Sequence, residues 1–164
     1  MSAWIWLGTA ALGVGLMAIA CRSKPVDPVE PAAGVLEGSM PVEHLLDGSQ
    51  SGYDCEGLVV CRDTDSFAEL WRKHASRQLP APAVPDVDFN TQYVLALFAG
   101  SRPSSGYSVH IDGVTAGKRS TMVFAREQKP DPGLAQATVM VSPFTMVLVP
   151  QFDGPAELIW ESRD

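Results

Sequence analysis

Short apolar or alternating runs, separated every few positions by turn-forming residues, constrain the fold of this chain more than any other feature. In the run Tyr107–Ile111, three apolar or aromatic residues alternate with two polar ones. This period of two is typical of a β-strand that buries one face. The run 93–98 is apolar throughout and predicts a central strand buried on both faces. Further runs predict strands over residues 41–46, 58–61, 121–125, 137–141, 145–149 and 158–160.

Turn chemistry separates these predicted strands. Turns are expected at Asp112-Gly113, Ala116-Gly117-Lys118, Pro130–Gly133, Ser142-Pro143 and Asp153-Gly154-Pro155. Many short strands with such spacing indicate a mainly β protein with a single antiparallel β-sandwich or barrel-like domain.

One segment has the period of a helix instead. Phe67, Leu70, Trp71 and His74 are spaced i, i+3, i+4 and i+7, which predicts a helix over about residues 65–76. The preceding Asp63–Ser66 segment offers several N-caps, and Ser66 with Glu69 has the spacing of a capping box. We expect this helix to cover one open face or edge of the β-structure.

The N-terminal segment does not belong to that domain. Residues 3–20 are apolar apart from Thr9, and Ala18-Ile19-Ala20 precede Cys21. This pattern resembles a bacterial lipobox and implies a signal peptide over residues 1–20, cleavage before Cys21 and a lipid on its sulfur. Basic residues follow the apolar run and none precedes it, which leaves an uncleaved membrane anchor as the alternative.

Residues 21–38 are expected to form the lipidated cysteine and a Pro-rich tether, because their composition cannot bury a core. Residues 39–164 are expected to form the β-rich domain. The resulting protein would be exported and anchored in the bacterial cell envelope by its lipid. Arg22 follows the cysteine where Asp would signal inner-membrane retention, so the outer membrane is mildly preferred.

Two cysteines remain in the domain if Cys21 carries the lipid. Cys55 and Cys61 enclose five residues, and an even pair in an exported protein predicts a disulfide. The alternative is two unpaired thiols.

Charge and motifs narrow the classes of function. The formal net charge of −7 and the lack of a basic stripe argue against nucleic-acid binding. His44, His74 and His110 lie far apart with no ligand spacing, so we expect no metal site. The sequence has no G-x-S-x-G motif and no phosphate-binding loop, so we expect neither enzymatic activity nor a cofactor.

A polar loop from Gly100 to Gly106 is the strongest candidate for function. Pro103 fixes one backbone angle, and the two glycines permit positive φ where the chain turns. A stiff loop loses little entropy on binding, and Arg and Tyr are enriched at interface hot spots. The predicted partner-binding residues are Arg102, Pro103, Ser104, Ser105, Gly106 and Tyr107.

The alternative is a structural loop, with Tyr107 packed in the core and Arg102 paired with a nearby acid. A second stiff loop, over residues 130–133, could lie at the same end of the sandwich or at the opposite end.

Several motifs in order carry a family resemblance. They are Ser51-Gly52, Phe67-x-x-Leu70-Trp71-x-x-His74, Pro85-x-Val87-Asp88-Phe89, Val94–Phe98 with Gly100, Arg102-Pro103-x-x-Gly106-Tyr107-Ser108-Val109, Pro132-Gly133 and Ser142-Pro143-Phe144. Together they resemble the PrcB family, named from a protein that stabilises a protease complex. The resemblance implies a small β-rich domain, usually in an exported lipoprotein, with no known enzymatic activity.

The resulting hypothesis is a non-enzymatic envelope lipoprotein that binds a protein partner and stabilises a surface protease complex. Ser104-Ser105-Gly106-Tyr107 stands where PrcB members commonly have Thr-Gly-Gly-Tyr, and it is more weakly similar to the Thr-Thr-Gly-Tyr loop of chagasin-like peptidase inhibitors. A peptidase inhibitor and a structural or ligand-binding envelope domain are therefore the alternatives.

Overall fold

The computed structural model describes residues 38–133 and 135–161. The predicted signal peptide, the lipidation site Cys21 and the tether up to residue 37 lie outside the described residues. Within the two described ranges, no helix is both long and apolar enough to cross a bilayer.

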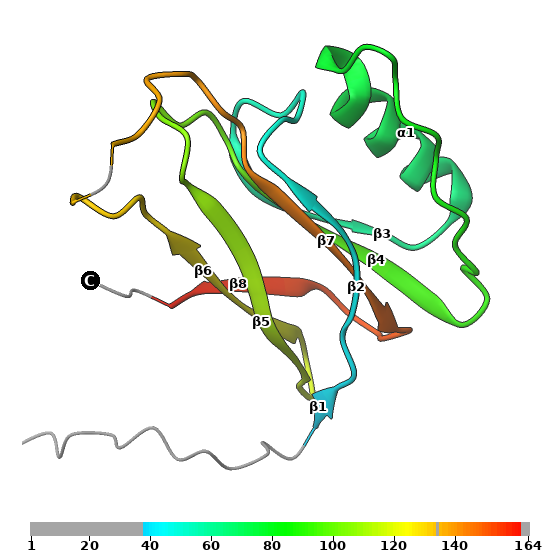
Figure 1. The fold of residues 1–164 in the computed structure, drawn as a ribbon. Helices are drawn as coiled ribbons and strands as arrows, with labels where there is room; N and C mark the ends of the chain where they lie inside the picture. Colours follow the sequence, from blue (N-terminus) through cyan, green and yellow to red (C-terminus); the bar gives the residue numbers. More distant parts are fainter. Residues whose placement is uncertain (1–37, 134, 162–164) are drawn as a thin grey trace, which may run out of the picture. The chain divides into compact units, whose positions relative to one another are not determined.

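The prediction of a mainly β domain with one helix is confirmed (Figure 1). One four-stranded sheet has the order β1-β5-β6-β8, and we call it the first sheet. The second sheet has the order β2-β7-β4-β3. The strands are β1 (Ser39–Met40), β2 (Glu43–Gly48), β3 (Glu56–Cys61), β4 (Gln92–Ala99), β5 (Ser108–Ala116), β6 (Thr121–Gln128), β7 (Phe144–Pro150) and β8 (Ala156–Trp160). Helix α1 (Thr64–His74) continues into a 3-10 turn, Ala75–Arg77.

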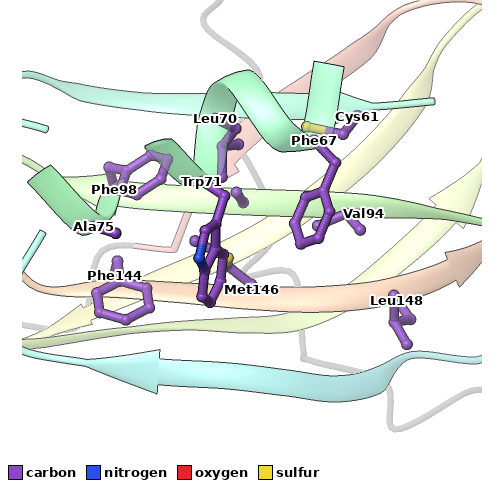
Figure 2. Packing of buried hydrophobic residues seen from close by; sticks show 11 residues of the cluster. Cys61, Phe67, Leu70, Trp71, Ala75, Val94, Phe98, Phe144, Met146 and Leu148 are labelled. Atoms are coloured by element: carbon purple, nitrogen blue, oxygen red, sulfur yellow. The ribbon is translucent and has the colours of Figure 1, made fainter. Parts of the chain in front are cut away.

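The second sheet is the middle layer of the domain. Helix α1 packs on one of its faces, and Figure 2 shows Phe67 and Trp71 of the helix among buried residues of β4 and β7. The other face packs against the first sheet. Strand β4 therefore alternates between two cores: Val94, Ala96 and Phe98 face the helix, whereas Leu95, Leu97 and Ala99 face the first sheet. This confirms the prediction of a central strand buried on both faces.

Helix α1 forms where the apolar spacing predicted it. Asp63 is the N-cap, and its carboxylate accepts a hydrogen bond of 2.8 Å from the backbone N–H of Ser66. The buried residues of the helix are Phe67, Leu70, Trp71 and His74, which are the four that the pattern placed on one face. The helix starts one residue earlier than predicted, and its last predicted turn is the 3-10 turn.

Two details of the sheets differ from expectation. Strand β8 pairs with β6 in parallel, although the other pairs are antiparallel. Asp112-Gly113 is not a turn but lies inside β5, where the register with β6 shifts between Ile111 and Gly113. A β-bulge of this kind absorbs an extra residue without ending the strand.

The predicted disulfide is wrong. Cys55 is exposed, Cys61 is buried, and both are free thiols. Residues 56–61 form β3, so at about 3.3 Å per residue the two Cα atoms lie roughly 20 Å apart. A disulfide requires a separation of about 4.4–6.8 Å. Burial also raises the pKa of the Cys61 thiol to about 11.

Candidate functional site

The predicted binding loop connects β4 of the second sheet to β5 of the first, at one end of the sandwich (Figure 1). Gly100 has φ +74° and Gly106 has φ +100°, so both glycines take the positive φ that was predicted for them. A Cβ atom on Gly100 would lie 2.8 Å from the carbonyl oxygen of Asp54. Glycine is therefore needed at this position both for its conformation and for the close approach of the neighbouring backbone.

Arg102 fastens this loop to both sheets. Its Nε donates a hydrogen bond of 2.5 Å to Glu127 of β6, and its guanidinium lies 3.4 Å from Glu56 of β3. The hydrogen bond with Glu127 raises the pKa of Arg102, so the side chain stays charged. Its backbone also pairs with that of Val141 through bonds of 2.7 and 2.9 Å. The Arg102 side chain is 22% exposed and already paired with acids, as in the structural interpretation of the loop.

The other predicted residues of the loop are placed differently. Pro103 and Gly106 are exposed, whereas Ser104, Ser105 and Tyr107 are half-buried. The N–H of Ser105 donates to the carbonyl of Ala137 at 3.0 Å, and its hydroxyl accepts from the N–H of Ala137 at 3.1 Å. The exposed part of the loop is therefore its tip.

The strand that the sequence predicted over residues 137–141 does not form, and residues 135–141 run beside this loop. Their ends are tied to the loop by the bonds from Ala137 to Ser105 and from Val141 to Arg102. Between these ties, the N–H of Val139 bonds to the carbonyl of Ala137, which bends the backbone. Val139 and Met140 are left 47% and 62% exposed.

The second stiff loop lies at the same end of the sandwich. A Cβ atom on Gly106 would lie 3.1 Å from Cβ of Pro130 and 2.5 Å from Oε1 of Gln136. The sequence left open at which end of the sandwich this second loop lies, and the structure places it beside the first loop. We name the surface formed by the tip of the first loop with residues 130–133 and 135–141 the loop end.

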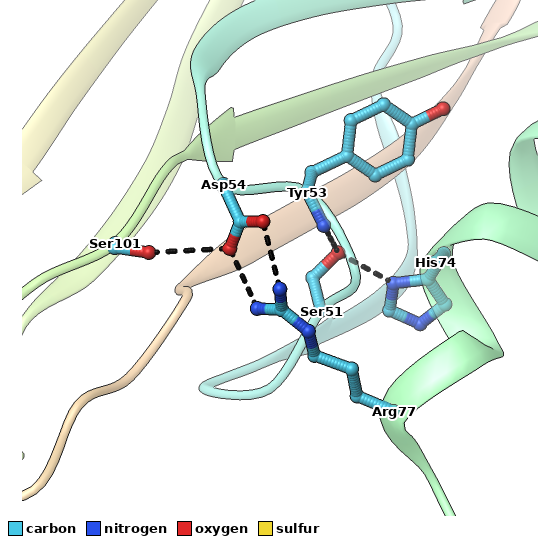
Figure 3. Close-up of polar contacts among 6 residues, drawn as sticks. All are labelled: Ser51, Tyr53, Asp54, His74, Arg77 and Ser101. Atoms are coloured by element: carbon cyan, nitrogen blue, oxygen red, sulfur yellow. Dashed lines mark hydrogen bonds and ion pairs between the residues drawn. The ribbon is translucent and has the colours of Figure 1, made fainter.

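A polar network holds the start of the Gly100–Gly106 loop at Ser101 (Figure 3). The backbone N–H of Ser101 donates to the backbone carbonyl of Asp54 at 3.2 Å, and the Ser101 hydroxyl donates to the Asp54 carboxylate at 3.3 Å. Arg77, just beyond helix α1, makes two bonds to the same carboxylate, at 2.6 and 2.7 Å. These bonds lower the pKa of Asp54, chiefly through the hydrogen bond from Arg77.

Ser51 and His74 form a fully buried pair next to this network (Figure 3). Nδ1 of His74 lies 3.1 Å from the Ser51 hydroxyl, and Nε2 lies 3.3 Å from the amide nitrogen of Gln78. Because the Gln78 amide is a donor, Nε2 accepts and Nδ1 carries the proton toward Ser51. In this tautomer His74 does not accept the Ser51 proton. The pair fastens the helix to the Ser51–Asp54 segment, aided by the 2.9 Å bond from the Gly52 N–H to the His74 carbonyl.

We expect His74 to make stability depend on pH. Burial lowers the pKa of His74 below its ordinary value, so the unfolded chain binds a proton first as the pH falls. The free energy of unfolding should decrease as the pH falls below about 6.5, the ordinary pKa of histidine, and should go on decreasing until the lowered pKa is passed, by up to about 1.4 kcal/mol per pH unit. Urea denaturation at a series of pH values measures this slope. The depressed pKa values of Asp54, Asp63 and Asp88 place their effects at lower pH.

His74→Gln is the control for this prediction. It removes the titrating group while His44 and His110 stay in place, so the slope in this window should flatten whatever the variant's stability at neutral pH. An equal slope in both proteins would assign the pH dependence to other groups.

The contacts between most of these residues could not be predicted from the sequence. Ser51 and His74 are 23 positions apart in the sequence, and no local pattern links them. Val139 and Met140 fall within the strand predicted over residues 137–141, because an apolar run looks the same in a sequence whether it forms a strand or a bent segment. Among the residues that the structure describes, no group of three His, Cys, Asp or Glu side chains is placed to hold a metal ion.

Comparison with known families adds to this geometry. The model of the family described as PrcB C-terminal matches residues 93–150, which confirms the resemblance seen in the motifs. The match begins in β4, includes the Gly100–Gly106 loop and residues 135–141, and ends at the last residue of β7. Searches of curated proteins and of solved structures found no match to this chain.

Proposed function

Because residues 93–150 match the model of the family described as PrcB C-terminal, we propose that this chain is an accessory subunit that binds and stabilises a protease complex. The contact surface in this proposal is the loop end. The observation that carries the proposal is that the family match includes the loop and the segment tied to it.

The geometry of the loop end favours contact with a protein. Pro103, Val139 and Met140 are exposed on two segments that hydrogen bonds hold side by side. Two sheets and the end of the helix brace these segments, so binding costs little conformational entropy. In this proposal the apolar side chains make the contact, and Arg102 positions the loop without touching the partner.

We further propose that the protein is non-enzymatic, exported and anchored in the bacterial envelope through a lipid on Cys21. The burial of the Ser51–His74 pair supports a structural role for these residues, because substrate cannot reach them. The apolar segment over residues 3–20 and the small residues before Cys21 support the anchor.

Site-specific photocrosslinking in cells that express the native protein tests the contact surface. A photoreactive amino acid at Met140 should crosslink to a protease. The control position is Lys118, an exposed residue in the β5–β6 turn, at the opposite end of β5 from the loop. Capture of the same protease from both positions would show that the loop end is not the contact.

Charge placed on the loop end should abolish the association. The double variant Val139→Asp and Met140→Asp should recover at least about thirtyfold less protease, as expected for hot-spot residues, whereas Lys118→Asp recovers the wild-type amount. Unchanged recovery by a folded double variant would overturn the assignment of the surface. A Met140 crosslink to a protein that belongs to no protease complex would overturn the proposed partner.

One observation also favours peptidase inhibition as a second candidate. The Ser104–Tyr107 loop and the Pro130–Gly133 loop lie at the same end of the sandwich, as a loop-based inhibitor requires. Titration of the full chain against cysteine and serine peptidases separates the two candidates. A stabilising subunit leaves the peptidase active, whereas an inhibitor abolishes its activity stoichiometrically.

A further inference from the structure

Strand β3 has an open edge at the side of the second sheet. The N–H of Ala99 bonds to Pro143 on the β7 side of β4, although Ala99 lies opposite Glu56 in the β3–β4 register. Glu56 therefore forms no ladder bond with β4, and because bonding alternates along a strand, neither do Leu58 and Val60. Their backbone groups point outward, and no strand in the described residues pairs with them.

This edge has few of the features that prevent strands from pairing, since Glu56 is its one charged residue. Its register with β4 is unbroken over six residues, and its centre is Leu58-Val59-Val60. At the opposite side of the same sheet, β2 has a register shift between His44 and Leu46 and carries Glu43, His44 and Asp47. Bulges and charges of that kind protect an edge, and a regular apolar strand invites pairing.

A groove runs along β3 beneath helix α1. Its volume is about 520 Å³, and Tyr53, Val59, Cys61 and Leu70 contribute to its lining. Nothing lies within 4 Å of the position that a Cβ atom on Gly57 would occupy, so the strand itself leaves space there. The outward backbone edge is therefore accessible next to a partly apolar hollow.

The charges of the groove are complementary to those of a second copy. Helix α1 starts directly after the Cys61 end of β3 and finishes beside Tyr53, where Nζ of Lys73 lies 4.1 Å from the ring centroid. Along the wall, Glu69 precedes Arg72 and Lys73, and in the described part of the chain none of the three is in an ion pair. A two-fold axis through the middle of β3 would bring Glu69 toward Arg72 of the partner subunit. Such local attraction is needed because each chain carries a formal charge of −7.

We propose that β3 pairs with β3 of a second copy of this chain in antiparallel orientation, joining the two second sheets into one continuous sheet. The interface is isologous, since each copy offers the same strand and the same helix wall. It is separate from the loop end and does not depend on the function proposed for that surface.

Sedimentation velocity of the full chain in detergent, over a range of protein concentrations, tests this pairing. We expect a reversible monomer–dimer equilibrium. Glu56→Pro removes an outward N–H in each copy without removing a bond to β4, and should weaken the dimer at least about tenfold. Glu56→Thr is the matched control, because it keeps the N–H while losing the same contact with Arg102.

Charge reversal provides a test that does not alter the strand. Glu69→Arg and Arg72→Glu should each weaken the dimer, and the two substitutions together should restore it. Circular dichroism establishes that each variant is folded. A monomer at all concentrations would overturn the proposal. An extended segment of another protein would then be the remaining candidate to pair with the edge of β3. A dimer that is insensitive to all of these substitutions would place the contact elsewhere and equally overturn it.

Discussion

Gly52→Ala is expected to lower the free energy of unfolding by about 3 kcal/mol, the upper part of the range for overpacked sites. A Cβ atom at this position would lie 2.0 Å from the carbonyl oxygen of Lys73 and 2.3 Å from the Ser76 hydroxyl. The nearer obstacle is helix backbone, which cannot rotate away. The Ser51–Asp54 segment would have to move off the helix, with loss of the Gly52–His74 bond and the Ser51–His74 contact. Urea denaturation of both proteins measures the difference.

Gly113→Ala is the matched control for this substitution. Gly113 lies in β5, and nothing is within 4 Å of where its Cβ atom would be. The free energy of unfolding of the Gly113→Ala variant should stay within about 0.5 kcal/mol of the wild-type value. Equal losses for both variants would mean that glycine matters at position 52 for some reason other than the close approach to Lys73.

Phe98→Ala is expected to cost about 3–5 kcal/mol, as for a fully buried aromatic side chain. Phe98 is 1% exposed, and its ring stacks on that of Tyr53 with centroids 3.9 Å apart. It also packs near His74 and Phe144, so truncation leaves a cavity between helix α1 and the second sheet. The midpoint and slope of the denaturation curve should separate lost stability from a change in unfolding mechanism.

Phe124→Ala tests whether burial is the cause. Phe124 lies on β6 and is only half-buried, so its truncation should cost distinctly less than that of Phe98. A similar cost for the two phenylalanines would contradict the deeper burial of Phe98 between helix α1 and the second sheet.

The pattern of apolar residues within a segment predicted those elements whose burial that pattern reflects directly. The apolar run around Leu95 could be assigned to a central strand because a strand with two buried faces has no polar alternation. The i, i+4 spacing of Phe67 and Trp71 was enough to predict the helix that contains them. The same reasoning failed for residues 137–141, since an apolar run does not show whether hydrogen bonds pair it with a strand or bend it back on itself.

The candidate site depends on contacts that a sequence does not display. The glycines of the loop were predictable, because positive φ leaves a recognisable composition. The partners of Arg102 were not, since Glu127 lies 25 positions away and only the pairing of two sheets brings it close. For the cysteines, spacing suggested a bridge, and the extended conformation of the residues between them excludes it.

The contrast between the two cysteines of the domain gives the protein a chemical handle. Cys61 has no exposed surface, and its raised pKa keeps the thiol protonated at neutral pH, so alkylating reagents should leave it unmodified. Cys55 is exposed and adjoins Asp54, whose carboxylate holds the Gly100–Gly106 loop. A fluorophore attached there would report from the base of the loop end and the first residue of β3 at once, without any substitution in the domain.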